Sequence, residues 1–403
     1  MKVVIVNHSD TKGGASVVSF RLMEALRAEG IDARMLVGEK NSSSPFVEQA
    51  ASRARVRIPF YKEHLRIYLQ NGFSRSRLFQ ASIATDGLPL SSHPLVREAD
   101  AVILNWVNQG LLSLKEIGRI ARLKPIFWVM HDQWNFTGIC HHTGGCDKFM
   151  SHCHNCPLVG WEKGSRDLSY RTFERKKSLY GSASITFIAV SPWLAHRAAQ
   201  SELLKGQKVE SVANAFPVER FAGSPKYSRG NLWLPEDKKL IVFCAARIDD
   251  PGKGLSDAIE RLNSLVPAHK HDVFAVFVGA MRNPHALDSL RLPHIWIPPV
   301  ADDDKIASIM AHATAALSTS PFETFSTTMI EAQAAGATPV CYTHDGRGDI
   351  VTDGVDGYSL SVRPTALYDA LFNPIDRAVL KKSAQKYSAS SVAKQIIRII
   401  SQH

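Results

Sequence analysis

The chain has 403 residues, of which 45% are hydrophobic, and this length excludes a single small module because it suffices for two domains with separate cores. Its formal net charge of +10 indicates an anionic partner such as nucleic acid, an anionic lipid or a phosphorylated small molecule, although a basic surface can also serve solubility alone. The apolar run at residues 3–6 is too short for a signal peptide, and no run approaches the roughly 18 apolar residues of a membrane-spanning helix. We therefore expect a cytosolic protein.

Short apolar strands alternate with helical stretches along the whole chain. Such alternation is typical of parallel α/β architecture. The sequence predicts two doubly wound, Rossmann-like domains that face each other across a cleft and present the carboxyl ends of their strands to it. In chain order, strands are expected at residues 3–8, 33–38, 101–106, 125–131, 186–191, 240–246, 273–279, 294–298, 315–320 and 338–343.

A segment rich in proline, glycine and charge separates the fifth expected strand from the sixth and indicates a domain boundary. We expect an N-terminal Rossmann-like domain over residues 1–215, which contains a cysteine-rich insert at 138–160. A linker at 216–236 precedes a C-terminal Rossmann-like domain at 237–385. The last segment, 386–403, is expected to be a helix that can pack back on the N-terminal domain.

Part of the positive charge is concentrated in residues 51–79, where seven lysines and arginines accompany one acid, Glu63. Aromatic residues are interleaved with these basic side chains. This composition favours a surface for a lipid headgroup or a phosphate, and hence peripheral contact with an anionic membrane.

Four of the six cysteines lie close together in CHHTGGCDKFMSHCHNCP, with the spacing C-x5-C-x6-C-x2-C. In a cytosolic chain such clustering favours metal binding over disulfides, and four thiolates would form a closed, structural zinc site. Labile disulfides, free thiols and an iron–sulfur cluster are the alternatives. Because the insert directly follows the expected strand at residues 125–131, we expect it to border the cleft and to shape a ligand site there. The predicted zinc ligands are Cys140, Cys146, Cys153 and Cys156.

The stretch SPFETFSTTMIEAQAAG, residues 320–336, places two glutamates around the start of an expected helix. If Ser326 caps this helix, Glu323 lies on the preceding loop, Glu331 lies more than one turn into the helix, and Gly336 ends it. The helix N-terminus between the two carboxylates attracts anions. A ligand with hydroxyl groups at both ends and phosphate in the middle suits this arrangement, and nucleotide sugars have that layout.

The same stretch and its continuation, ATPVCYTHDGRGDIVTDGVDGYSL, resemble the C-terminal signature of family 4 retaining glycosyltransferases of GT-B fold. In that family a glutamate, seven intervening residues and a second glutamate bind the donor. Further segments agree, namely KVVIVNHSDTKGGAS followed by FRLMEALRAEG, VMHD, SVANAFPVERF and AARIDDPGKGLSDAIE. The chain looks closest to bacterial exopolysaccharide transferases of the colanic-acid type, which carry a similar cysteine-rich insert. It departs from many relatives at Thr324 and Ser326, where they have glycine.

The resemblance implies a retaining hexosyltransferase that moves a sugar from a UDP- or GDP-sugar to a glycan acceptor. It places the acceptor on the N-terminal domain and the nucleotide sugar on the C-terminal domain. A lipid-linked acceptor would connect the enzyme to bacterial surface polysaccharide biosynthesis at the inner face of the cytoplasmic membrane. A nucleotide-sugar epimerase of the same fold is an alternative. So is a basic, zinc-containing nucleic-acid-binding protein, but the excess charge lies away from the cysteines, so we expect no nucleic acid partner.

The resemblance also implies roles for individual residues. Glu323 would contact the hydroxyls of the donor sugar, and Glu331 the ribose diol. Arg247 and Lys253 would neutralise the diphosphate, so no catalytic metal is expected. His131 would lie beside the donor sugar near the anomeric centre. The remaining predicted donor-site residues are Gly13, Gly14, Phe325, Ser326 and Thr327. Structural alternatives are a helix-surface glutamate at 331, a solvated loop pair at 247 and 253, and a core histidine at 131.

Overall fold

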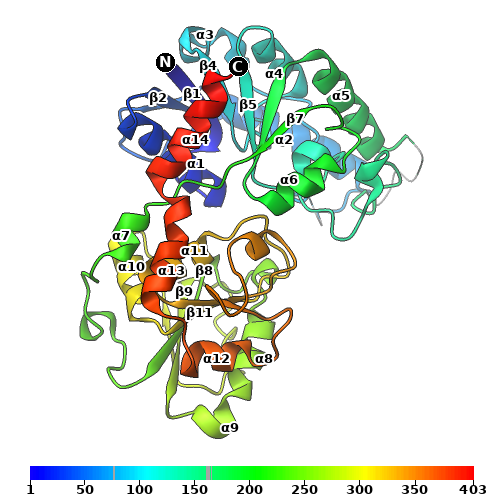
Figure 1. Cartoon of the computed structure of the whole chain (residues 1–403). Coiled ribbons are helices and arrows are strands. Elements are labelled where there is room, and N and C mark those ends of the chain that lie inside the picture. The colour runs from blue at the N-terminus through cyan, green and yellow to red at the C-terminus, as the bar shows by residue number, and fades with distance from the viewer. Residues whose placement is uncertain (76–77, 160–163, 165) are drawn as a thin grey trace. The chain divides into compact units, whose positions relative to one another are not determined.

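The computed structural model describes residues 1–75, 78–159, 164 and 166–403 and divides them into two compact units (Figure 1). Unit 1 comprises residues 1–215 with 390–403, and unit 2 comprises residues 216–389. Residue 160 of the predicted insert and residues 76 and 77 of the basic stretch lie outside the described residues. Among the described helices, none combines the length and the apolar character needed to cross a membrane.

Unit 1 is built on a parallel sheet of seven strands in the order β3-β2-β1-β4-β5-β6-β7. Strands β4, β5 and β6 are buried at every position and, apart from Thr186, apolar, as expected for parallel strands covered on both faces. The chain leaves β1 toward β2 and later returns to pair β4 with the other side of β1, so the strand order reverses there. The strands are β1 (Lys2–Ser9), β2 (Asp32–Glu39), β3 (Val47–Gln49), β4 (Ala101–Leu104), β5 (Ile126–Met130), β6 (Ile185–Ala189) and β7 (Lys208–Ser211).

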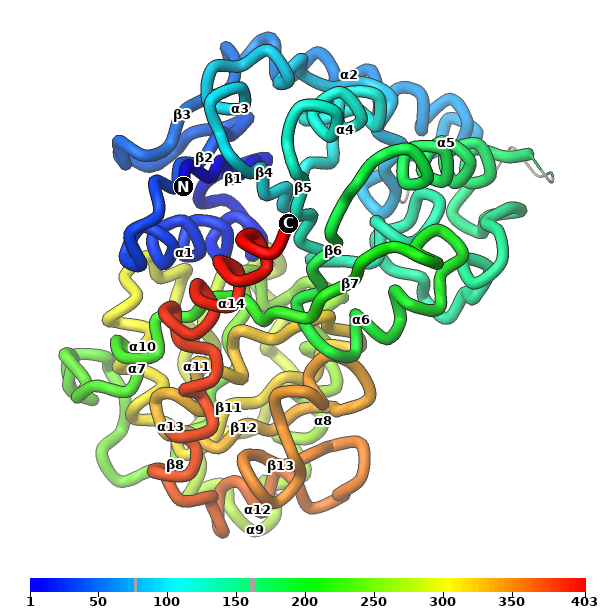
Figure 2. Tube along the Cα trace, turned by 45° about the horizontal axis from the view of Figure 1, so that its top comes forward, coloured from blue at the N-terminus to red at the C-terminus, as the bar shows by residue number. Residues whose placement is uncertain are grey.

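The C-terminal helix α14 packs beside α1 in unit 1 (Figure 2). Ser390 donates a hydrogen bond to Glu29, and apolar residues of the two helices line one small cavity. The helices of this unit are α1 (Gly14–Ala28), α2 (Arg53–Gln70), α3 (Pro94–Glu98), α4 (Leu114–Ala121), α5 (Leu168–Ser182), α6 (Pro192–Ala199) and α14 (Ala389–Ser401).

Unit 2 contains a second parallel sheet, with six strands in the order β10-β9-β8-β11-β12-β13. Its strands are β8 (Lys239–Arg247), β9 (Val273–Ala280), β10 (His294–Ile297), β11 (Ala315–Ser318), β12 (Thr338–Cys341) and β13 (Tyr358–Ser359). Its helices are α7 (Val218–Ala222), α8 (Leu255–Ser264), α9 (Val266–His269), α10 (Asp303–His312), α11 (Thr327–Ala335), α12 (Ala366–Phe372) and α13 (Arg377–Ala384).

The predicted fold class is confirmed, because both units are Rossmann-like parallel α/β domains. The ten expected strands are present, and the structure adds β3, β7 and β13. Each of these three lies at a sheet edge, where a short strand needs no continuous apolar run. The cleft between the domains stays a prediction.

Residues 216–236, which we expected as a linker, lie within unit 2. They include α7, and the backbone N–H groups of Lys226 and Tyr227 donate to the hydroxyl of Ser308 on α10. The expected C-terminal helical segment also divides between the units, because residues 386–389 belong to unit 2 and 390–403 to unit 1.

Candidate active site

The turn between β8 and α8 brings Lys253 to the carboxyl end of β11. Lys253 ends a short 3-10 turn that begins at Pro251, and Gly254 follows with a φ of 70°. A Cβ at Gly254 would lie 2.0 Å from the carbonyl oxygen of Thr319, so only glycine permits this approach. The Thr319 hydroxyl donates to the Gly254 carbonyl at 2.8 Å and fastens the two segments together.

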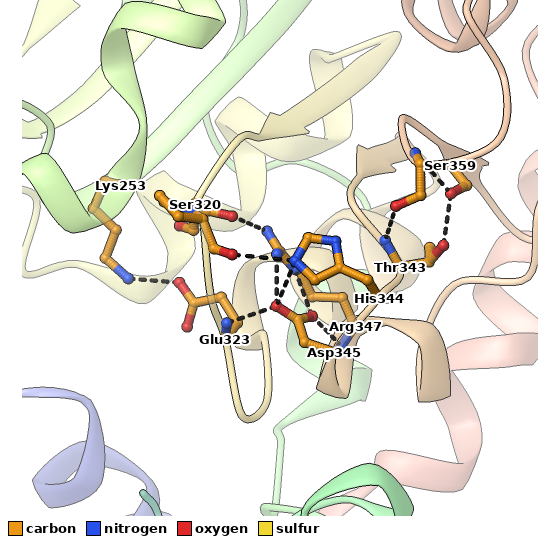
Figure 3. Close-up of polar contacts among 10 residues, drawn as sticks. Lys253, Ser320, Glu323, Thr343, His344, Asp345, Arg347 and Ser359 are labelled. Carbon is orange, nitrogen blue, oxygen red and sulfur yellow. Dashed lines mark hydrogen bonds and ion pairs between the residues drawn. The ribbon is translucent and has the colours of Figure 1, made fainter. Parts of the chain in front are cut away.

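Lys253 and Glu323 form an ion pair, in which Lys253 Nζ lies 2.7 Å from Glu323 Oε1 (Figure 3). Both side chains remain accessible, with 37% of the lysine side chain and 20% of the glutamate side chain exposed. The structure therefore brings together two of the predicted site residues that are 70 positions apart in sequence. A partly solvated pair of this kind contributes at most about 1 kcal/mol, so an incoming anion can replace its carboxylate.

Arg247, the last residue of β8, is paired with acids of its own loop. Its Nη2 donates to Asp250 at 2.7 Å, and its Nε lies 3.6 Å from Asp249. The pKa of Asp249 is lowered by hydrogen bonds from the backbone N–H groups of Asn283 and Arg282. This arrangement matches the structural alternative for Arg247, and its role at a diphosphate stays a prediction.

Helix α11 begins after Ser326 and ends at Gly336, whose φ is 81°, as the sequence predicted. The predicted capping of α11 by the Ser326 side chain is wrong, however. Within the described chain, the buried Ser326 side chain makes no hydrogen bond to the first turn of α11. Glu331 lies half-buried on this helix, and its charge adds to burial in raising the pKa of Cys244 on β8. The structure thus places Glu331 near the carboxyl-terminal half of β8.

The other predicted residues at this helix start have different surroundings. The Phe325 ring packs edge-on against Tyr387 with 5.9 Å between ring centroids, so its side chain is committed to packing. Thr327 is the first residue of α11 and is half-buried. Their contribution to donor binding stays a prediction.

Two residues that sequence reasoning missed, Asp345 and Arg347, support the loop that carries Glu323 (Figure 3). Asp345 accepts the backbone N–H of Glu323 at 2.8 Å. The signal available in the sequence was the charged run HDGRGD, which directly follows an expected strand.

In unit 1, His131 follows β5 and Asn105 follows the neighbouring β4. His131 Nε2 donates to Asn105 Oδ1 at 2.7 Å. Burial lowers the pKa of His131 to about 4, against the opposing charge of Asp132. The ring is therefore neutral near pH 7, with its proton on Nε2. Asn105 was also missed, although it is a polar residue at the end of an expected strand.

Gly13 and Gly14 lie at the N-terminal end of α1. Gly13 has a φ of 88°, which favours glycine, and α1 begins at Gly14. A Cβ added to either glycine would meet no atom of the described residues within 4 Å. This open space agrees with the expectation that a ligand can approach the loop closely, and the contact itself stays a prediction.

The cysteine-rich insert holds free thiols whose acidity is reduced by their surroundings. Burial raises the pKa of Cys140 to about 11 and that of Cys153 to about 12. The backbone N–H of Gly138 donates to Cys153 Sγ at 3.2 Å. Over the described ranges, no three histidine, cysteine or acidic side chains are grouped so that they could hold a metal ion. This arrangement of the thiols does not fit a tetrahedral zinc site, and zinc binding stays a prediction.

Beside these cysteines lies a cavity of about 600 Å³. His141 lines it, and its Nδ1 donates to Asp132 Oδ2 at 2.7 Å. Burial acts against ionisation of Asp132, but His141, the backbone N–H of Trp134 and His142 together lower the pKa of Asp132 to about 2. The other lining residues are Phe79, Gln80, Cys140, His142, Thr143, Gly144, Cys146, Cys156, Pro157 and Leu158.

Comparison with known proteins finds relatives that are similar to parts of this chain. Over 221 residues the chain is 29% identical to phosphatidyl-myo-inositol mannosyltransferase of Mycobacterium tuberculosis, a match that covers 50% of this chain and 55% of that protein. Over 169 residues it is 24% identical to the putative colanic acid biosynthesis glycosyl transferase WcaC of Escherichia coli, which covers 40% of each. The chain thus spans about half the length of the curated relatives it matches.

Solved structures of similar fold cover the whole chain. Anabaena HepE in complex with UDP has a TM-score of 0.64 and 15% identity, and each chain is covered completely. WaaG, a glycosyltransferase involved in lipopolysaccharide biosynthesis, has a TM-score of 0.60 at 15% identity, again with complete coverage of both chains. These likenesses show a GT-B type fold. Residues 229–390, which contain the Lys253–Glu323 pair, match the family model of glycosyl transferases group 1.

Proposed function

We propose that this chain is a retaining glycosyltransferase that moves a sugar from a UDP- or GDP-sugar to a lipid-linked glycan acceptor in bacterial surface polysaccharide biosynthesis. The observation that carries the proposal is the Lys253–Glu323 pair at the carboxyl ends of β8 and β11, inside the matched region. In parallel α/β sheets this edge is where ligands bind. The two relatives, a phosphatidyl-myo-inositol mannosyltransferase and a putative colanic acid biosynthesis glycosyl transferase, support the same substrate classes.

In this proposal the donor rearranges the ion pair. A diphosphate beside Lys253 offers more negative charge than one carboxylate and takes the place of Glu323 as the partner of the ammonium group. Glu323, released from Lys253, then accepts hydrogen bonds from the hydroxyls of the donor sugar. Glu331 binds the ribose diol. Arg247 leaves Asp249 and Asp250 and binds phosphate oxygens instead.

The reaction proceeds by front-face attack. The acceptor hydroxyl attacks the anomeric carbon on the side from which the diphosphate leaves, and the departing phosphate oxygen receives the hydroxyl proton. Lys253 and Arg247 stabilise the charge that develops on the leaving group, which is the largest contribution a site of this kind makes. His131, which is neutral near pH 7 and hydrogen-bonded to Asn105, is assigned to the donor sugar near its anomeric centre.

The acceptor side of the proposal is supported by the cavity beside the cysteine-rich insert. The aromatic side chain of Phe79 lines this cavity and packs on His64 of α2, with 5.0 Å between ring centroids. The Phe79 ring therefore connects the wall of the cavity with helix α2. A lipid-linked glycan has an apolar part that suits such a path.

Helix α2 carries the proposed membrane contact. It buries Val56, Pro59, Glu63 and Ile67 and exposes four large side chains at helical spacing, namely Ile58 (53%), Tyr61 (63%), Leu65 (56%) and Leu69 (47%). Exposed basic residues flank this apolar stripe at positions 53, 55, 57, 62 and 66. An apolar stripe with basic flanks is typical of helices that lie in the interface of an anionic bilayer.

Structural zinc at the four clustered cysteines is a separate proposal. Binding would require the thiols to lose their protons and to move into tetrahedral geometry, because they are not so arranged here. The N–H bond to Cys153 Sγ is a contact that also stabilises a thiolate. Metal analysis should find about one zinc per chain. A metal-free protein with four titratable thiols in this segment would leave the insert as a free-thiol element.

The test of the function is sugar transfer itself. The purified chain is incubated with UDP- and GDP-sugars and a lipid-linked glycan, and release of the nucleotide diphosphate is measured with the anomeric configuration of the product. We expect one nucleotide series to support transfer with retention of configuration. An inverted product, or isomerised donor without transfer, would contradict the proposal, and the second result would favour the epimerase alternative.

A further inference from the structure

The segment that carries Glu323 has irregular backbone, so its polar groups need partners outside regular structure. It follows β11, and the segment at 343–349 follows β12, the neighbouring parallel strand. Ser318 at the end of β11 is in register with Cys341 at the end of β12. The two segments therefore leave the sheet side by side.

An acid–base pair from the second segment holds the backbone of the first (Figure 3). Arg347 donates to both oxygens of Asp345, through Nε at 2.9 Å and Nη2 at 2.7 Å. Its Nη1 donates to the carbonyl of Ser320 at 2.7 Å. Asp345 Oδ2 also accepts the backbone N–H of Glu323 at 2.8 Å, and the N–H of Gly346 donates to the Glu323 carbonyl at 3.1 Å. Both backbone groups of Glu323 are thus fixed by residues 345–347.

This pair is buried, with 2% of Asp345 and none of Arg347 exposed. A buried ion pair contributes little net stability, because desolvation of the two charges offsets their attraction. Besides bonding each other, Arg347 donates to the carbonyl of Ser320, and Asp345 accepts the backbone N–H of Glu323. The contacts therefore determine where one short loop lies.

We propose that Asp345 and Arg347 are positioning residues that set the place of the Glu323 carboxylate opposite Lys253. The other end of the loop is held independently, since Thr319 is bonded to Gly254. The loop is thus fixed on one side to the Lys253 turn and on the other to the Asp345–Arg347 pair. Positioning for the donor sugar rests on the proposed function, but the placement of Glu323 against Lys253 does not.

The chain contains a matched control for this pair. Asp353 and Arg363 in unit 2 also form a carboxylate–guanidinium pair, with Arg363 Nη2 at 2.9 Å from Asp353 Oδ2. Asp353 Oδ1 likewise accepts a backbone N–H, from Ser359 at 2.9 Å. Asp353→Asn therefore removes the same kind of contact without touching the Glu323 loop.

The first experiment needs no donor. Side-chain carboxyl carbons of glutamate are labelled with ¹³C, and the Glu323 resonance is assigned by its loss in Glu323→Gln. Asp345→Asn should move this resonance toward its position in Lys253→Ala, whereas Asp353→Asn should leave it unchanged. If Asp345→Asn does not fold, Arg347→Lys replaces it, because lysine cannot bond both Asp345 oxygens and the Ser320 carbonyl together. An unmoved Glu323 resonance in a folded variant would overturn the proposal.

The second experiment measures affinities for a nucleotide sugar and for the free nucleotide diphosphate. Asp345→Asn should weaken nucleotide-sugar binding by about tenfold or more, in the range lost with a hydrogen bond to a charged group. Free nucleotide should lose less than about threefold, and Glu323→Gln should remove the effect, since coupled residues are not additive. Equal losses for both ligands would overturn the proposal. Absence of nucleotide-sugar binding by the unmodified chain would instead overturn the proposed function, with the carboxyl resonance still deciding the role of Asp345.

Discussion

Lys253 Nζ and Glu323 Oε1 lie 2.7 Å apart, although the two residues come from turns that follow different strands. The pairing depends on Gly254, which lets the lysine turn approach Thr319 at the end of β11. Without ligand, each residue neutralises the charge that the other would offer to a donor. In the proposed function, binding of a nucleotide sugar therefore requires the pair to separate.

Lys253→Ala should lower the turnover number by on the order of a hundredfold or more, because the proposed mechanism assigns Lys253 to stabilise the leaving diphosphate. The matched control is Lys238→Ala. Lys238 also pairs with an acid in unit 2, Asp237 at 2.8 Å, but lies at the start of the β8 region, away from its carboxyl end. Steady-state kinetics of both variants check this prediction. Similar turnover in the two would remove Lys253 from the mechanism.

Glu323→Gln should abolish transfer without trapping a sugar on the protein, since Glu323 is assigned to hydroxyl binding and front-face attack needs no protein nucleophile. Intact-protein mass spectrometry during turnover tests this. Glu331→Gln provides the comparison, because it should weaken binding of the nucleotide even when no sugar is attached. A glycosyl adduct that depends on Glu323 would replace front-face attack with a double displacement.

Transfer should persist in the presence of a chelator that leaves any zinc in the cysteine-rich insert in place. The reason is that Lys253 and Arg247 are assigned the neutralisation that a divalent cation would otherwise supply. Rates are compared with and without chelator, and zinc content is measured in the same samples. Strict dependence on magnesium or manganese would contradict this assignment.

Reversal of charge at Arg53, Arg55 and Arg57 should weaken binding to anionic vesicles, at about 1 kcal/mol for each basic residue near the surface. Replacement of Ile58 and Leu65 by serine should also weaken it, through loss of apolar insertion. Leu123→Ser is the control, because Leu123 is similarly exposed (49%) on another part of unit 1. Vesicle sedimentation measures the partitioning. If none of the α2 variants changes it, the stretch is an ordinary solvated surface.

The half-buried His131 should make stability depend on pH. Its pKa is about 4 in the folded chain against an ordinary value of 6.5, so the unfolded chain binds more protons between these values. Stability is therefore lost as the pH falls from 6.5 toward 4, by about 2 kcal/mol between pH 7 and pH 5. Urea unfolding of the chain and of His131→Gln at both pH values checks this. Between pH 7 and pH 5 the unmodified chain should lose more of its free energy of unfolding than His131→Gln. Equal losses in the two proteins would exclude His131 as the cause.

Strands could be predicted from the sequence where both of their faces are buried, because such strands consist of apolar residues. Central strands such as β5, Ile126–Met130, are covered on both faces and read as apolar runs. The edge strand β7, Lys208–Ser211, is partly exposed and has an alternating, charged sequence that carries no such signal. Its position is set by pairing with β6, which depends on the rest of the sheet.

The candidate site was predictable only as far as strand ends could be located. Lys253 and Glu323 follow recognisable strands, so their shared edge could be expected. The role of the Asp345–Arg347 pair could not be predicted from the sequence. It depends on β12 lying beside β11 and on the Arg347 guanidinium reaching the backbone of the neighbouring loop. Cysteine spacing likewise indicated a metal site but does not determine where the sulfur atoms lie.

Donor binding at Lys253 is the central claim, and a thermal-shift series tests it most directly. The chain and its Lys253→Ala variant are heated with UDP, GDP and their sugars, since a ligand that binds only the folded state raises the apparent melting temperature. The account predicts that one nucleotide series stabilises the unmodified chain and that Lys253→Ala loses most of this shift. No shift with any nucleotide or nucleotide sugar, or an equal shift in the variant, would contradict it.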